Sequence, residues 1–212
     1  MPIPYNKAMH KHKKIIRYLY INGIGGSHGS WFNNFIMWWW QINGKKLELL
    51  TVDWFVNQSV DDLVGAVLKK IDQLYKESDN VVLIGSSAGG SLAVNAFCAD
   101  SRSQTQVVVS RGRLKRGAYP SNDKRSLARW SKTSQTFCES VLRAEHNVTL
   151  LSPAQKERMF IMIPLTDNVV PIETMLVDGV TTYKSFAFGH FGGHMAHMLT
   201  NIWRIDRFAR KS

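Results

Sequence analysis

Short apolar runs alternate with longer segments of helical periodicity along most of the chain. The run Asn80–Gly85 is uniformly apolar, as expected of a strand that is covered on both faces of a sheet. Apolar residues recur every three or four positions in Ser59–Lys76, which predicts an amphipathic helix. By the same criteria we expect further strands over Lys14–Asn22, Leu47–Asp53, Gln106–Ser110, Arg158–Pro164 and Thr181–Ala187, and further helices over Ser87–Ala99 and His194–Phe208.

This alternation of strands and helices predicts an α/β fold. Parallel strands joined by right-handed helical crossovers form a sheet with helices on both faces. We therefore expect a three-layer sandwich around a mainly parallel sheet of about six strands, within one domain over residues 1–212. The segment Thr181–Ala187 is the more polar strand, which favours a place at the sheet edge.

The interval between the fourth and fifth predicted strands is longer than a single crossover helix needs. This segment, residues 111–157, is rich in Lys and Arg and contains a turn-like stretch at Tyr119–Asp123. Two interpretations remain open. The segment forms either a small helical cap over the carboxyl edge of the sheet, or a crossover with one extra surface helix.

The pentapeptide Gly85–Gly89 has the pattern G-x-S-x-G between a buried strand and a helix. A serine on such a sharp turn is held in a strained conformation, and its small neighbours let the strand and helix approach closely. The motif therefore predicts Ser87 as a nucleophile, with the N–H of Ala88 at a helix N-terminus where negative charge develops. The alternatives are a turn without chemistry or a phosphate-binding loop, but the Lys of a P-loop does not follow.

A serine nucleophile needs a histidine base and an acid that orients the base. Asp167 follows the predicted fifth strand and is expected at the same rim as Ser87, whereas Asp178 precedes the next strand and is the weaker candidate. His190, on a glycine-flanked loop, is the preferred base, and His194 in the first helical turn is the alternative.

Three closely spaced histidines also raise the possibility of a metal site. The spacing of His190, His194 and His197 suits ligands on one helix face. Gly192 and Gly193 argue against a single helix that spans all three, and the glutamate of an H-E-x-x-H motif is missing. We therefore expect no metal and no organic cofactor, and we expect His197 to pack or to cap a helix.

Four features in this order resemble the α/β-hydrolase family: the glycine loop Asn22–Gly26 after the first strand, the turn around Ser87, the segment Asp167–Pro171, and His190. The resemblance extends over Lys14–Phe208. It implies a compact version of the fold without the family's usual first two strands. The family often has a histidine before the first glycine of the loop, where this chain has an asparagine.

The resemblance also implies a serine hydrolase that acts through an acyl-enzyme, most often on carboxylic esters. We expect the backbone N–H groups of Ile24 and Ala88 to form the oxyanion hole, and Gly23, Trp31 and Phe32 to contact a small ester or lactone substrate. A thioester or an amide is the alternative substrate. The competing class is a non-catalytic module with this fold that binds an anionic partner through its basic surface.

The chain has 27 basic and 16 acidic residues, which gives a net charge of +11. The basic residues concentrate in Lys7–Arg17, Arg111–Lys132 and Arg204–Lys211, without a recognisable nucleic-acid-binding motif. We therefore interpret them as a solvated surface and do not expect a nucleic-acid partner.

Two further features indicate a cytoplasmic protein. The N-terminus lacks the pattern of a signal peptide, and the apolar runs are too short to span a bilayer.

The two cysteines, Cys98 and Cys138, are expected to be free thiols. Three adjacent tryptophans, residues 38–40, must point in different directions, so at least one is expected at the surface or under a cap.

Overall fold

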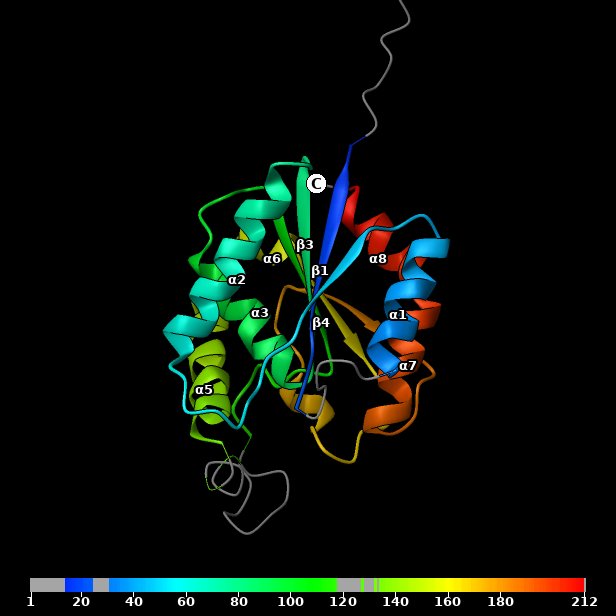
Figure 1. Cartoon of the computed structure of the whole chain (residues 1–212). Helices are drawn as coiled ribbons and strands as arrows, with labels where there is room; N and C mark the ends of the chain where they lie inside the picture. The colour runs from blue at the N-terminus through cyan, green and yellow to red at the C-terminus, as the bar shows by residue number, and fades with distance from the viewer. Residues whose placement is uncertain (1–13, 25–30, 118–126, 128–131, 133, 212) are drawn as a thin grey trace, which may run out of the picture.

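The computed structural model describes residues 14–24, 31–117, 127, 132 and 134–211, apart from the side chain of Phe191. Its centre is a sheet of six strands in the order β2-β1-β3-β4-β5-β6, and every neighbouring pair is parallel (Figure 1). The strands are β1 (Ile16–Ile21), β2 (Leu47–Leu50), β3 (Asn80–Ser86), β4 (Thr105–Ser110), β5 (Met159–Ile163) and β6 (Thr181–Lys184).

Helices cover both faces of the sheet, which confirms the predicted three-layer arrangement (Figure 1). One face carries α2 (Val60–Tyr75), α3 (Ala88–Ala99) and α5 (Gln135–Thr149), and the other carries α1 (Trp31–Ile42), α7 (His190–Thr200) and α8 (Ile202–Ala209). The short α6 (Pro153–Glu157) precedes β5, and the 3-10 helix η1 (Ile172–Thr174) lies between β5 and β6. The polar strand β6 is at the sheet edge, as predicted.

The hydrophobic core has two halves because successive strand residues point to opposite faces. Leu19 and Leu83 pack on the α2–α3 side, whereas Tyr18, Val82 and Ile84 pack on the α1–α8 side. Both faces of the central strands are buried, so β3 is apolar without a break from Val81 to Ile84, and β1 is apolar apart from Arg17.

The predicted helix over His194–Phe208 is wrong in its start and in its continuity. The chain forms two helices: α7 begins at His190, and α8 begins at Ile202 after Asn201. Gly192 and Gly193 lie inside α7, although the sequence argued against a helix through them. A Cβ atom on Gly193 would lie 1.5 Å from Nη2 of Arg111, so glycine at this point of the helix leaves room for the buried guanidinium.

The long segment 111–157 supplies the crossover between β4 and β5. Its main helix α5 packs against α3, and α6 is an extra short helix on the way to β5. Most of residues 118–133, where a cap would be built, lie outside the described residues, so the cap remains a prediction.

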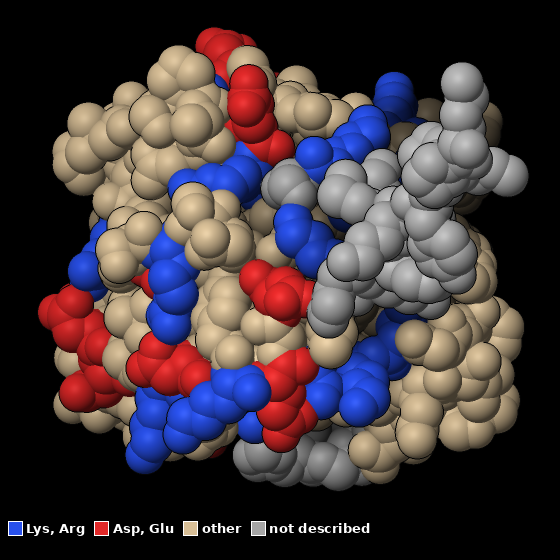
Figure 2. Space-filling view, turned by 90° about the horizontal axis from the view of Figure 1, so that it is seen from above, with Lys and Arg blue, Asp and Glu red and all other residues tan. Residues whose placement is uncertain are grey.

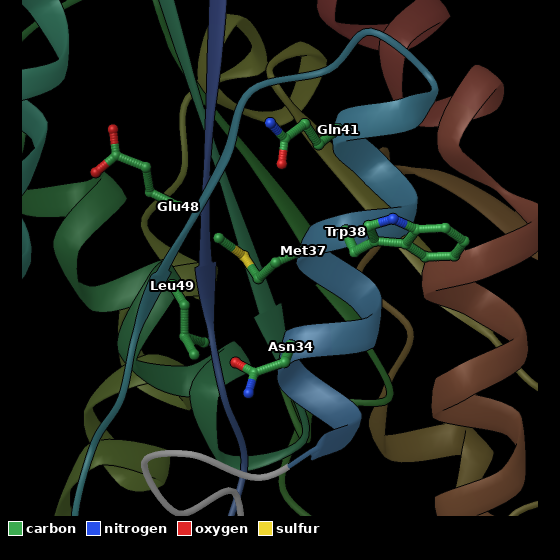
Figure 3. Close-up of a pocket in the computed structure, with 6 residues that line it drawn as sticks. All are labelled: Asn34, Met37, Trp38, Gln41, Glu48 and Leu49. Carbon is green, nitrogen blue, oxygen red and sulfur yellow. The ribbon is translucent and has the colours of Figure 1, made fainter.

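A hollow of about 520 Å³ lies between α1 and β2, the edge strand at the end of the sheet away from β6 (Figure 3). Asn34, Met37 and Gln41 point from the helix toward the strand, while Trp38 extends to the opposite side of the helix. Trp40, two residues further, is fully buried, and the side chain of Trp38 is 51% exposed. The adjacent tryptophans therefore diverge as predicted, and none of the residues that line this hollow is a predicted catalytic residue.

In the part of the chain that the structure describes, no helix is both long and apolar enough to cross a bilayer. Cys98 and Cys138 are both free thiols, as predicted, and burial raises the pKa of each to about 11.

Candidate active site

Ser87 lies on a strained turn between β3 and α3. Its backbone has φ 50° and ψ −118°, a conformation that a residue with a side chain rarely adopts. The N–H of Ser87 donates to the carbonyl of Ser110 at the end of β4, with an N···O distance of 2.9 Å. This contact ties the turn to the neighbouring strand and holds the serine at the carboxyl edge of the sheet.

The two glycines that flank Ser87 allow this turn because no side chain fits at either position. A Cβ atom on Gly89 would lie 2.2 Å from the carbonyl oxygen of Ile21, and one on Gly85 would lie 2.4 Å from the carbonyl oxygen of Gly89. The approach of α3 to β1 and β3 therefore depends on glycine at both ends of the G-x-S-x-G pattern.

His190 connects Ser87 to Asp167 through hydrogen bonds. Its Nε2 lies 2.9 Å from Oγ of Ser87, and its Nδ1 lies 2.9 and 3.1 Å from the two carboxylate oxygens of Asp167. His190 is the first residue of α7, after β6, and Asp167 follows β5. The carboxyl ends of three strands thus bring together three of the residues that the sequence predicted, and Asp178 lies apart on an exposed turn.

The carboxylate of Asp167 is completely buried and is held from two sides. Oδ1 accepts the backbone N–H groups of Val169 and Val170 at 2.8 and 2.9 Å. Burial raises the pKa of Asp167, but the hydrogen bonds from His190 and these backbone groups outweigh burial and lower the pKa below its ordinary value. Asp167 is therefore ionised near neutral pH.

Arg111 is a buried residue of this site that the sequence analysis placed among the solvated basic residues, which is wrong. It follows β4 with φ 59°, and its side chain is completely buried. Nη1 donates to the carbonyl oxygens of Gly189 and His190 and lies 4.0 Å from Oδ2 of Asp167. Burial lowers the pKa of Arg111 to about 10, although the charge of Asp167 opposes this shift. Arg111 thus fixes the start of α7 beside the carboxylate.

The sequence held no local signal for this role of Arg111. The predicted strand Gln106–Ser110 places Arg111 at a strand end, but the space beside Gly193 that its guanidinium fills belongs to a distant segment of the chain.

The other two histidines of α7 make separate contacts. His194 hydrogen-bonds to Oγ of Ser86 at 2.7 Å and to the hydroxyl of Tyr20. His197 hydrogen-bonds to Ser110 at 2.8 Å and to Ser185. Burial, helped by the charge of Arg111, lowers the pKa of each to about 3, so both are neutral near pH 7. The structure thus brings His190 to Ser87 and directs His194 to the preceding serine.

The three histidines of α7 consequently do not converge on a common point. No group of three His, Cys, Asp or Glu residues in the described ranges has an arrangement that could hold a metal ion.

The loop after β1 runs directly beside the nucleophile. A Cβ atom on Gly23 would lie 3.1 Å from Cβ of Ser87 and 3.7 Å from the backbone nitrogen of Ala88. Ala88 is the first residue of α3, so its N–H has no acceptor within the helix. Ile24 follows Gly23 and is the last described residue of this loop. This arrangement suits the oxyanion hole expected from Ile24 and Ala88.

Trp31 and Phe32 are the first two residues of α1, which covers the face of the sheet opposite to α3. The ring of Phe32 is 5.7 Å from the imidazole of His194, and the ring of Trp31 is 6.2 Å from that of Phe32. Trp31 is 73% exposed. Both aromatic side chains remain candidates for substrate contact, with Phe32 on the inner side.

Comparisons with known proteins find similar solved structures but no match among family models or curated sequences. A solved structure reported under "LipS and LipT, two metagenome-derived lipolytic enzymes" is 14% identical, with a TM-score of 0.70 over 94% of this chain and 95% of the other. Est1E from Butyrivibrio proteoclasticus is 12% identical, with a TM-score of 0.61 over 95% and 91% of the two chains.

The chain has the α/β-hydrolase fold. A structure described as an α/β-hydrolase enzyme, MGS-MChE2 from the metagenome of lagoon sediments of Mar Chica, Morocco, has a TM-score of 0.61 at 17% identity, over 94% of this chain and 93% of the other. In this α/β-hydrolase fold the sheet has six strands in the described residues and begins with the strand that precedes the glycine loop. This agrees with the compact version expected from the sequence.

Proposed function

We propose that the protein is a serine hydrolase that cleaves carboxylic esters of small molecules. The observation that carries the proposal is the chain of hydrogen bonds from Ser87 through His190 to Asp167, with Ser87 on a strained turn at a helix N-terminus. A nucleophile, a base within hydrogen-bond reach and a group that orients the base are the parts that acyl transfer requires.

In the first half of the reaction, Oγ of Ser87 attacks the ester carbonyl carbon while Nε2 of His190 takes the hydroxyl proton. The carbonyl π electrons move to oxygen, and a tetrahedral intermediate forms. When the bond to the alkoxy group breaks, His190 gives its proton to the leaving alcohol. The acyl group stays on Ser87 as an ester.

In the second half, water replaces the alcohol. His190 takes a proton from the water as its oxygen attacks the acyl carbon. Collapse of this second intermediate breaks the bond to Ser87, and the proton on His190 returns to Oγ. The acid product leaves, and the free serine is restored without any cofactor.

Asp167 and the backbone N–H groups supply the electrostatic part of this mechanism. The ionised carboxylate holds Nδ1–H of His190 and stabilises the imidazolium that forms during each step. The N–H groups of Ala88 and Ile24 point at the carbonyl oxygen as it becomes negative. Donors held in place by a helix start and a glycine loop need little rearrangement when the charge develops.

The structural relatives support an ester as the substrate, because several are described as lipolytic enzymes or esterases, and Est1E is also described with bound ferulic acid. A lactone is an internal ester and would react by the same steps. A thioester or an amide would need the same residues with a different leaving group, and we propose the oxygen ester as the primary substrate.

A panel of p-nitrophenyl esters of short and medium acyl length tests the proposal. We expect turnover by the wild type, and loss of about a thousandfold or more in kcat for Ser87→Ala and for His190→Asn. His194→Asn is the matched control, four residues further along the same helix, and keeps activity because its contacts are to Ser86 and Tyr20. Circular dichroism shows that each variant is folded.

Two results would overturn the proposal. Full ester turnover by folded Ser87→Ala would exclude this serine as the nucleophile. A folded wild type that hydrolyses none of the esters, lactones, thioesters or amides offered would favour a non-catalytic binding module.

A further inference from the structure

A groove with a strongly basic lining lies at the end of the sheet opposite to Ser87. It has a volume of about 650 Å³ and is bounded by α8, by α6 and by the amino ends of β5 and β6. Figure 2 views the molecule from this end, where Lys and Arg side chains are interspersed with Asp and Glu. The catalytic residues are at the carboxyl ends of the same parallel strands, so the groove is separate from that site.

The lining of the groove is more basic than the chain as a whole. About one residue in eight of the chain is Lys or Arg, so twelve lining residues would include one or two. The groove has four, Arg158, Arg204, Arg207 and Lys211, against one acidic residue, Glu157. The concentration of charge therefore exceeds what the high pI of the protein explains.

These four cations have no carboxylate partner among the residues that the structure describes. Most of the other described arginines lie within ion-pair distance of a carboxylate, namely Arg17, Arg102, Arg111, Arg113, Arg143 and Arg210. Arg210 is one residue from Lys211 and pairs with Asp206 at 3.0 Å, so carboxylates are present nearby but are already used. Unpaired like charges around one hollow repel each other, and an anion between them removes that repulsion.

Two of the four side chains are already held in place. Nη1 of Arg158 donates to the backbone carbonyl oxygens of Arg102 and Thr105 at 3.0 and 2.7 Å, and its guanidinium lies over the ring of Phe97. The guanidinium of Arg204 lies 3.8 Å from the ring centroid of Tyr183. Because stacking fixes these planar groups in advance, an anion loses less side-chain entropy on binding them.

The spacing of the cations along the chain indicates the shape of the anion. Arg204 and Arg207 are one turn apart on α8, and Lys211 follows the end of that helix, so the three span about 10 Å at 1.5 Å per residue. An extended acidic peptide places side chains on one face only every 7 Å or so, at about 3.4 Å per residue. A chain of linked phosphates carries negative charge on every unit, and its oxygens match the two-pronged donor geometry of arginine.

We propose that this groove binds a linear oligophosphate, either as a free inorganic chain or as the phosphate chain of a nucleotide. The phosphates lie along Arg204, Arg207 and Lys211, and Arg158 binds them from the side of β5. Thr181 and Thr182, at the start of β6, also line the groove. This binding site is independent of the proposed ester hydrolysis, because it shares no residue with the catalytic site.

Isothermal titration of the full-length protein with sodium tripolyphosphate at low ionic strength tests the site. The test variant is Arg204→Gln/Arg207→Gln. The matched control is Lys69→Gln/Lys76→Gln, which removes the same charge from exposed lysines on and just after α2. We expect the test variant to bind about a hundredfold more weakly than the wild type, about tenfold for each guanidinium. The control binds within about threefold of the wild type.

Further titrations distinguish the source of the phosphates and the function of the two sites. ATP that binds more tightly than tripolyphosphate identifies a nucleotide, and the reverse order identifies an inorganic chain. Ser87→Ala binds as tightly as the wild type, and Arg204→Gln/Arg207→Gln keeps any ester turnover. Failure of ester hydrolysis therefore leaves this proposal intact.

Three results would overturn the proposal. The first is that the wild type binds neither oligophosphate. The second is that both double variants lose affinity equally, because this would indicate attraction by net charge alone. The third is that a polyglutamate peptide binds more tightly than either oligophosphate, which would assign the groove to an acidic protein partner.

Discussion

The buried His197 predicts how the stability of the protein changes with pH. Its side chain is inaccessible, its two ring nitrogens are hydrogen-bonded to Ser110 and Ser185, and its pKa is lowered to about 3 by burial and by the charge of Arg111. In the unfolded chain a histidine has a pKa of about 6.5. As pH falls below 6.5 the unfolded state takes up a proton that the folded state refuses, so stability is lost between pH 6.5 and 3.

The magnitude follows from these two values. A pH of about 5 is about 1.5 units below the pKa of the unfolded histidine. At about 1.36 kcal/mol per unit, protonation of the unfolded state lowers the free energy of unfolding by about 2 kcal/mol. A domain of this size has a free energy of unfolding of about 5–15 kcal/mol, so this one residue removes a measurable share of it.

Urea denaturation followed by tryptophan fluorescence, at about pH 7.5 and pH 5, measures this effect. We expect the pH-dependent loss of unfolding free energy to be about 2 kcal/mol smaller in His197→Asn than in the wild type. His146→Asn, which replaces an exposed histidine on α5, is the control and keeps the wild-type loss. An equal loss in His197→Asn and the wild type would refute the reasoning.

Four further substitutions have expected outcomes. Asp167→Asn lowers kcat for ester hydrolysis by about 10³- to 10⁴-fold in steady-state assays, because the amide no longer stabilises the imidazolium. Gly89→Ala lowers the free energy of unfolding by about 1–3 kcal/mol or prevents folding, since the methyl group would lie 2.2 Å from the carbonyl oxygen of Ile21. Gly65→Ala, on the open face of α2, raises the free energy of unfolding by up to about 1 kcal/mol. Urea denaturation measures both changes. Arg111→Lys lowers kcat roughly ten- to a hundredfold with little change in KM, because one ammonium group holds the start of α7 less precisely than the guanidinium.

Much of the fold, and the placement of three candidate site residues at one edge of the sheet, could be predicted because local physics decides them. The strands are apolar runs that must be covered on both faces, and the order of strands and helices leaves few topologies. The turn at Ser87 is visible in the sequence because only glycine fits at Gly85 and Gly89. Asp167 and His190 could be placed because each follows a strand, and parallel strands end at the same edge.

The features that the sequence analysis missed depend on contacts between distant segments. Gly193 lies within α7, and its missing side chain leaves the space that the guanidinium of Arg111, just after β4, occupies. The same arginine is buried although it begins a segment rich in Lys and Arg. Nothing near His194 in the chain shows that Ser86 and Tyr20 are its partners, since both lie more than a hundred residues away.

Labelling with a fluorophosphonate probe tests the central claim most directly, because the probe forms a stable bond only with an activated serine. We expect one adduct per wild-type molecule, located on Ser87 by peptide mapping, no adduct on Ser87→Ala, and strongly slowed labelling of His190→Asn. Absence of labelling in the folded wild type, or an adduct on a serine other than Ser87, would contradict the account.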